Sequence, residues 1–227
     1  MIAAELISDT LPAVKLTDTV SRVLDWMNEF KVTQLAVISA DKLYGIIREN
    51  DLLDAESGEN TIKETLYIDE HAPYGQSANL YILEGKHLYD VLSLMAKYKL
   101  EILPVCDINK HYLGVINIRD IVRNLGEMFA VNEEGSIVIV ETQRTNYSLA
   151  EVGRIVESTD ATVLSLYLYP VPDSTMLRIT LKVNVSNPSR VSAAFERYKY
   201  AVVMSYYHLD NIEDYKENID FLLKLME

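Results

Sequence analysis

Hydrophobic positions in the first half of the chain follow one pattern twice. The apolar face of a short helix occurs at Val20, Val23, Leu24 and Met27 and returns sixty-eight residues later at Leu88, Val91, Leu92 and Met95. Each helix pattern is followed by an apolar strand ("QLAVI" or "EILPVC"), a polar turn and a second strand ("LYGII" or "YLGVIN"). The pattern predicts two strand–helix–strand–strand–helix units. We expect them to pack together because neither small sheet can bury both of its faces alone.

A short motif closes each copy: "GIIRENDLL" starts at Gly45 and "GVINIRDIV" starts at Gly114. In both, a glycine and two aliphatic residues lead through polar or mixed positions to an aspartate, Asp51 or Asp120, and then to two more aliphatic residues. Two interpretations remain open. An aspartate at a helix start can serve as a cap, worth about 1 kcal/mol. Alternatively, a carboxylate accepts hydrogen bonds from two vicinal hydroxyl groups of a ligand.

The pattern changes in the last third of the chain. Strands are predicted in "SIVIVET", "TVLSLYLYPV", "MLRITLKVNV" and "AVVMSYYHL", and helices in "SLAEVGRIVEST" and "NPSRVSAAFERY". The resulting order, βαββαβ, is that of a ferredoxin-like domain. A last helix is predicted over residues 211–227, and its apolar side chains form one stripe: Ile212, Tyr215, Ile219, Leu222 and Met226. The stripe is too large to remain exposed to solvent, so it should pack on its own sheet or on a partner subunit.

Three segments follow from these patterns: a first repeat in residues 1–56, a second repeat in residues 57–130 and a C-terminal domain in residues 136–227. The expected fold class is α/β for the repeats and α+β for the C-terminal domain. The chain shows no long apolar run, no signal peptide and a single cysteine, so a cytoplasmic protein without a membrane span is expected. The net charge of −13 argues against binding to nucleic acid or to anionic lipid.

The twofold motif resembles tandem CBS domains over roughly residues 1–127. The resemblance implies a cleft for an adenosine-containing ligand, in which the aspartate holds the ribose hydroxyls and a preceding Ser or Thr lies near the phosphates. Asp51 and Asp120 match the aspartate, whereas Arg48 and Asn117 stand at the hydroxyl position. Arg48 either binds phosphate or fills the pocket. The second copy is favoured as the ligand site because Arg119 lies beside Asp120.

The last third resembles an ACT domain, and the order CBS–CBS–ACT is similar to that of the bacterial acetoin-utilisation regulator family. The resemblance implies a module that binds an amino acid at a subunit interface, with a proline–glycine loop before the first helix. Here Asn146 and Tyr147 stand at those two positions, and tyrosine cannot freely take the glycine-only conformations. Formation of a homodimer is therefore the role expected of this domain.

The sequence contains no pattern of catalysis. The four histidines show no metal-ligand spacing with one another or with Cys106, and the nucleophile-elbow, P-loop and dinucleotide motifs are absent. We therefore expect no enzyme activity, no metal and no tightly held cofactor. The leading hypothesis is a homodimeric regulatory protein that senses AMP, ADP, ATP or S-adenosylmethionine and acts on an unidentified regulated protein. The alternative is an adaptor that mediates protein association and binds no ligand.

Overall fold

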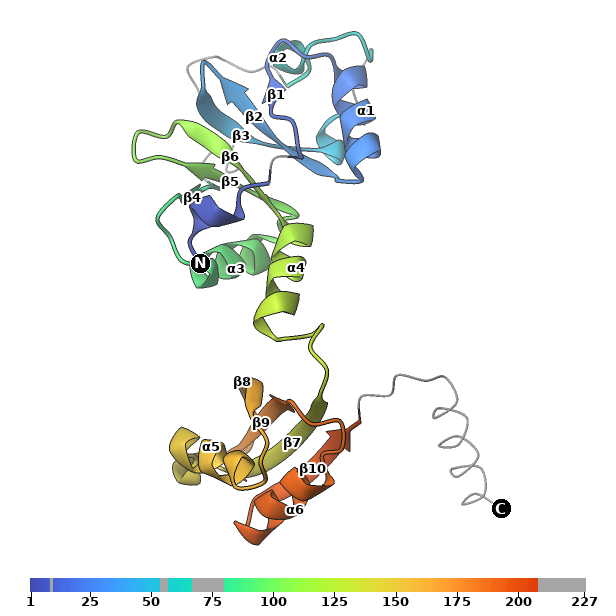
Figure 1. Cartoon of the computed structure of the whole chain (residues 1–227). Helices are drawn as coiled ribbons and strands as arrows, with labels where there is room; N and C mark the ends of the chain where they lie inside the picture. Colours follow the sequence, from blue (N-terminus) through green and yellow to red (C-terminus); the bar gives the residue numbers. More distant parts are fainter. Residues whose placement is uncertain (9, 54–56, 67–79, 208–227) are drawn as a thin grey trace, which may run out of the picture. The chain divides into compact units, whose positions relative to one another are not determined.

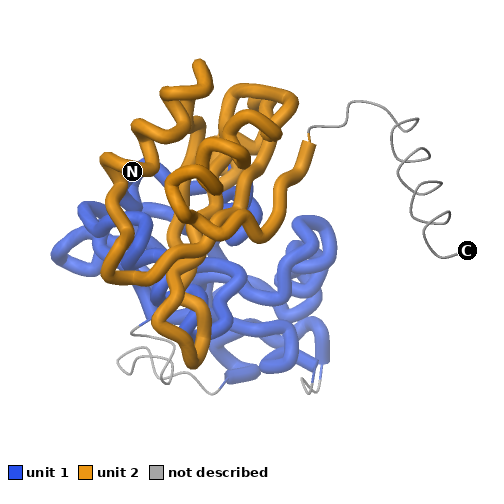
Figure 2. Tube along the Cα trace, turned by 90° about the horizontal axis from the view of Figure 1, so that it is seen from below, with its two compact units in different colours: residues 1–123 blue, residues 124–227 orange. Residues whose placement is uncertain are grey.

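The computed structural model describes residues 1–8, 10–53, 57–66 and 80–207. The chain forms two compact units, residues 1–123 and 124–227, coloured separately in Figure 2. The first unit contains the two repeats as far as residue 123, and the second contains the rest of the second repeat and the C-terminal sheet. The predicted helix over residues 211–227 lies outside the described residues. Within the part that is described, no helix has both the length and the apolar character needed to cross a bilayer.

The two repeats are built alike. The elements of the first are β1 (Val14–Lys15), α1 (Val20–Phe30), β2 (Gln34–Ser39), β3 (Lys42–Arg48), a 3-10 turn (Glu49–Asp51) and α2 (Ile62–Thr65). Those of the second are β4 (Ile82–Leu83), α3 (Leu88–Tyr98), β5 (Ile102–Cys106), β6 (Tyr112–Asn117) and α4 (Ile118–Met128). Each has a three-stranded sheet, β1-β2-β3 or β4-β5-β6, whose first pair is parallel and whose second pair is antiparallel. The copies differ at the aspartate, where the first forms only a 3-10 turn and the second starts an eleven-residue helix.

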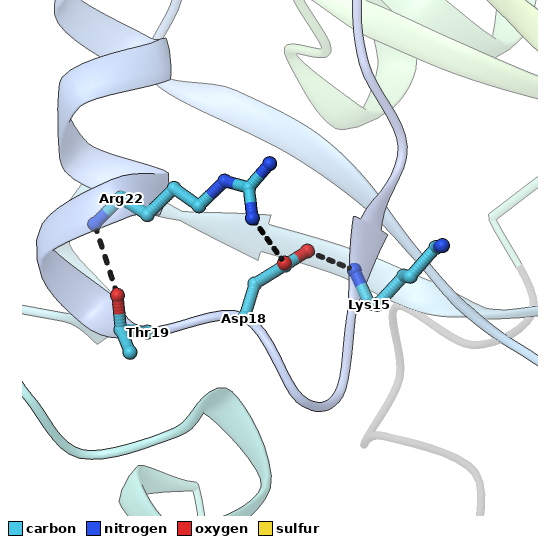
Figure 3. A network of polar contacts seen from close by, with 4 residues as sticks. All are labelled: Lys15, Asp18, Thr19 and Arg22. Atoms are coloured by element: carbon cyan, nitrogen blue, oxygen red, sulfur yellow. Dashed lines mark hydrogen bonds and ion pairs between the residues drawn. The ribbon is translucent and has the colours of Figure 1, made fainter.

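Polar side chains fix the start of α1. The Thr19 hydroxyl accepts from the Arg22 amide at 3.4 Å and caps the helix, as expected for threonine at this position. Asp18, which is almost fully buried, accepts from the Lys15 amide at 2.7 Å and from the Arg22 guanidinium at 3.5 Å. Figure 3 shows that Asp18 lies between the end of β1 and the first turn of α1 and joins the two.

The chain's first residues pair with the second repeat, although they precede the first. The Ala3 amide donates to the Lys86 carbonyl at 2.8 Å, and the Ser8 amide donates to the Val115 carbonyl at 2.8 Å. Gly114, the motif glycine of the second copy, has φ +153°, and a Cβ there would lie only 2.4 Å from the Ile7 side chain. This glycine is therefore required for the close approach of the N-terminal segment.

The second unit has the predicted βαββαβ order. Its elements are β7 (Ser136–Gln143), α5 (Leu149–Glu157), β8 (Val163–Pro170), β9 (Met176–Val183), α6 (Ser189–Arg197) and β10 (Ala201–Tyr206). The strands form one antiparallel sheet in the order β10-β7-β9-β8. Both helices lie on one face of this sheet (Figure 1), where Phe195, Ile155 and Val140 are among the fully buried core residues. The mixed α/β fold expected from the sequence is thus confirmed.

Candidate functional site

The two motifs occupy equivalent backbone positions. The first residue after β3, Glu49, donates its amide to the Thr33 carbonyl at 2.9 Å, and the first residue after β6, Ile118, donates to the Glu101 carbonyl at 2.8 Å. Thr33 and Glu101 are themselves sixty-eight residues apart. Asp51 and Asp120 therefore follow their strands at the same distance, and neither lies in the core.

Glu101 ties the two copies together. Its carboxylate accepts from both the amide and the hydroxyl group of Thr33, each at 2.9 Å. Its own amide donates to the side-chain oxygen of Gln34 at 3.1 Å. Because all three contacts cross from one repeat to the other, they hold the start of β2 against the start of β5.

A cleft of about 340 Å³ opens beside this contact. It is lined by residues from both copies: Thr33, Gln34, Arg48, Glu49, Asn50, Tyr98 and Lys99. Arg48 ends β3, whereas Tyr98 and Lys99 end α3. Among the described residues, the side chains of Arg48 and Lys99 make no hydrogen bond or ion pair. The cleft thus presents two cations, the carboxylate of Glu49 and a half-exposed tyrosine ring, beside the polar groups of Gln34 and Asn50.

Asp51 contacts the main chain of its own motif. One of its carboxylate oxygens accepts from the Arg48 amide at 2.9 Å, which caps the 3-10 turn, and the side chain is exposed. Asp51 is not among the residues that line the cleft. The capping interpretation left open by the sequence therefore has a direct counterpart in the structure, while one oxygen remains on the solvent side for other contacts.

The predicted residues of the second copy are held in internal contacts. Asn117 is buried, and its side-chain oxygen accepts from the Arg119 amide at 3.1 Å. The Arg119 guanidinium donates to the Phe30 carbonyl at 2.8 Å and to the Lys31 carbonyl, both at the C-terminal end of α1. Asp120 forms an ion pair with Arg123 one turn along α4.

The position of Arg119 distinguishes the two copies. Phe30 and Lys31 are the counterparts of Tyr98 and Lys99, which line the cleft of the first copy. In the second copy, the corresponding helix end is bound by the guanidinium of Arg119 instead. A cation at a helix C-terminus is favourable because the last carbonyls carry partial negative charge. Arg48 and Lys99 thus line the cleft at the end of β3, and the preference of the sequence for the second copy stays a prediction.

The described residues were compared with the requirements of a metal site and of a reactive thiol. No group of three or more His, Cys, Asp or Glu side chains among them is arranged to hold a metal ion. Cys106 is fully buried in β5, and this burial, followed by the nearby charge of Asp107, raises the pKa of its thiol to about 11. A thiol with this pKa is protonated at neutral pH and is a poor nucleophile.

Several residues that line the cleft were not predicted from the sequence. Three of them, Tyr98, Lys99 and Thr33, lie at the end of a helix or between the helix and the following strand, as does Glu101 beside the cleft, in stretches without motif character. One signal was present: Thr33 and Glu101 align at the repeat spacing, as do Phe30 and Tyr98. Two copies packed about a pseudo-twofold axis bring such equivalent positions face to face.

The first part of the chain matches a known protein family. Residues 3–58 and 77–127 match the CBS domain family model, so the tandem CBS pair predicted from the repeat is confirmed. A curated relative, inosine-5'-monophosphate dehydrogenase of Korarchaeum cryptofilum, is 27% identical over 117 residues. That match covers 52% of this chain but only 23% of the dehydrogenase, and it is confined to the CBS region.

Solved structures resemble the chain over a similar length. A CBS domain pair/ACT domain protein from Thermotoga maritima has a TM-score of 0.47 and 20% identity, over 56% of this chain and 98% of that protein. A putative acetoin utilization protein from Vibrio cholerae has a TM-score of 0.47 and 19% identity, over 58% of this chain and 95% of its own. The assignment of the C-terminal domain as ACT-like remains a prediction.

Proposed function

We propose that this tandem CBS pair binds an adenosine-containing nucleotide in the cleft beside Arg48, and that the chain is a regulatory protein that reports the ligand to another protein. AMP, ADP, ATP and S-adenosylmethionine are the candidate ligands. The observation that carries the proposal is the cleft itself, in which Arg48, Lys99 and Tyr98 from two copies converge.

The chemistry of the cleft suits a nucleotide. An aromatic ring provides a stacking surface for a base, and stacking is worth about 1–3 kcal/mol per base in nucleic-acid complexes. Arginine presents a planar fork of donors that matches phosphate oxygens. Because the chain as a whole carries a charge of −13, these local cations would have to overcome an unfavourable overall field. Binding should therefore weaken as salt screens the contacts of Arg48 and Lys99.

Arg48 has two opposed roles within this proposal. If its guanidinium reaches a terminal phosphate, Arg48→Ala weakens ATP more than AMP. If it fills the cleft, Arg48→Ala leaves the affinity unchanged or raises it. The first role is the one we propose, because Arg48 lines the cleft and its side chain has no hydrogen-bond or ion-pair partner among the described residues.

The second unit is proposed to join two chains and to transmit the signal. Within the described part of the chain, Tyr147, at the position of the ACT ligand loop, packs against the hydrophobic core. This placement of Tyr147 gives no support to amino-acid binding and leaves association as the proposed role.

The test is thermal unfolding with each nucleotide, including cyclic dinucleotides, followed by isothermal titration with the one that stabilises most. A ligand at 100 times its dissociation constant adds about 2.7 kcal/mol of stability. Arg48→Ala is compared with Lys15→Ala, which removes an exposed cation from the opposite edge of the same sheet. Loss of ATP affinity in Arg48→Ala alone supports the proposal. If none of the nucleotides stabilises the protein, the ligand-free adaptor is favoured. The internal contacts of Arg119 and Asp120 are consistent with that alternative.

A further inference from the structure

In the second unit, the described helices lie on one face of the sheet only. On this face, opposite α5 and α6, an apolar groove of about 770 Å³ is lined mainly by Phe129, Ile137, Ile139, Tyr167, Thr180 and Tyr206. Tyr206, Tyr167 and Phe129 each expose more than 40% of their surface. Exposed apolar surface of this extent usually marks a place where another part of the chain or another protein packs.

The groove has a floor and two walls. Ile137 and Ile139 project from β7 and form its floor. One wall is Phe129, whose ring lies 5.7 Å from the Tyr167 ring in an edge-on arrangement and whose carbonyl accepts from the Ser165 hydroxyl at 2.9 Å. The other wall is Tyr206 on β10, which pairs with Ile137 in the sheet. The groove therefore runs along β7, with β10 beside it.

The charged side chains around the groove already have partners. The Lys182 ammonium donates to the Ala130 and Val131 carbonyls, at 2.5 and 3.1 Å. Arg178 donates twice to the Glu141 carboxylate, at 2.6 and 2.9 Å. A charged ligand would find no unpaired side-chain charge among these groups. The groove instead suits a surface of apolar side chains.

A surface of this kind occurs in the chain just after the groove. Residues 208–227 follow Tyr206 almost directly, and their apolar stripe of Ile212, Tyr215, Ile219, Leu222 and Met226 has helical spacing. A helix over residues 211–227 would be about 25 Å long, at about 1.5 Å per residue. The eight residues of β7 extend over about 27 Å, at about 3.4 Å per residue. The stripe and β7, along which the groove runs, thus match in length.

We propose that residues 208–227 lie on this face of their own sheet, with the apolar stripe in the groove along β7. The covalent link favours this arrangement over docking of a second copy, because a short tether acts as an effective concentration in the millimolar range. The remaining side chains of the segment include six acidic and two basic residues, which would face solvent. The domain then has a layer on each face of its sheet.

The test uses a cysteine in the floor of the groove. Ile139→Cys introduces one thiol, and the natural Cys106 is fully buried, so alkylation of the folded full-length protein reports on the groove. Leu222→Asp, made in this background, places a charge in the stripe. Lys224→Asp is the matched control, because it changes the charge by more but lies across the helix from the stripe.

Leu222→Asp should speed alkylation of the groove thiol by about tenfold or more, since the rate follows the local opening of the covering segment. Lys224→Asp should leave the rate at that of the parent, and the rates should not depend on protein concentration. Three results would overturn the proposal. The first is that both aspartate variants speed alkylation of the groove thiol equally. The second is that this thiol already reacts as fast as a free thiol in the parent protein. The third is that its protection from alkylation is lost on dilution, which would assign the face to a second copy.

Discussion

Replacement of Arg119 by alanine should destabilise the first unit without touching either hydrophobic core. The substitution removes the donors to the Phe30 and Lys31 carbonyls and so leaves the end of α1 without its cation. Hydrogen bonds to a charged group are worth about 1.5–3 kcal/mol in favourable settings, and a cation at a helix C-terminus about 0.3–1 kcal/mol. Arg119 is exposed, and water can replace it at both carbonyls, so the lower range applies. We expect a loss of about 1 kcal/mol.

The chain provides its own reporter for this loss. Trp26 is the only tryptophan and lies in α1, so its fluorescence follows unfolding of the first unit during a urea titration. A loss of about 1 kcal/mol corresponds to a fall in melting temperature of about 2–4 °C for a chain of this size. Nucleotide titration of the same variant shows whether vacating the α1 end allows a second ligand to bind.

Arg123→Ala is the control for Arg119→Ala. Arg123 lies one turn further along α4 and pairs with Asp120, but its side chain is 70% exposed. Exposed pairs of this kind contribute about 0–1 kcal/mol, so the variant should stay near the parent. If the two alanine variants unfold at the same urea concentration, the contact of Arg119 with α1 contributes nothing particular, and the asymmetry between the copies loses its physical basis.

Two further outcomes follow from single positions. Gly114→Ala should destabilise the first unit by about 1–3 kcal/mol, the usual cost of overpacking, because the new methyl group would meet the Ile7 side chain; a urea titration that matches the parent would exclude this contact. Cys106 should alkylate slowly at pH 8 and about tenfold faster per pH unit towards pH 10, because its thiol has a pKa of about 11. Rapid alkylation of Cys106 at pH 7 would contradict the burial of this residue. Since the thiol of the unfolded chain ionises first, at about pH 9, the stability of the folded protein should also fall as the pH rises from about 9 to 11.

Local patterns in the sequence determined the secondary structure and the repeat. Helices α1 and α3 occur where apolar residues recur every three or four positions, and the strands occur where the patterns predicted them. The reason is physical: each element has to present one apolar face to a core, and its period follows from its own geometry. The same reasoning gave the βαββαβ order of the last third, which does not by itself distinguish an ACT domain from other domains of that topology.

The tertiary structure alone decided which side chains meet. Nothing in the local pattern indicates that Ser8 pairs with Val115 or that Arg119 reaches the end of α1. These contacts join residues far apart in sequence, so they depend on how two whole repeats pack, and a pattern read along the chain carries no such information. The sequence therefore identified a pair of equivalent motifs, and packing made them unequal. Arg48 lines a cleft beside the first motif, whereas Arg119 of the second motif is bound to the end of α1.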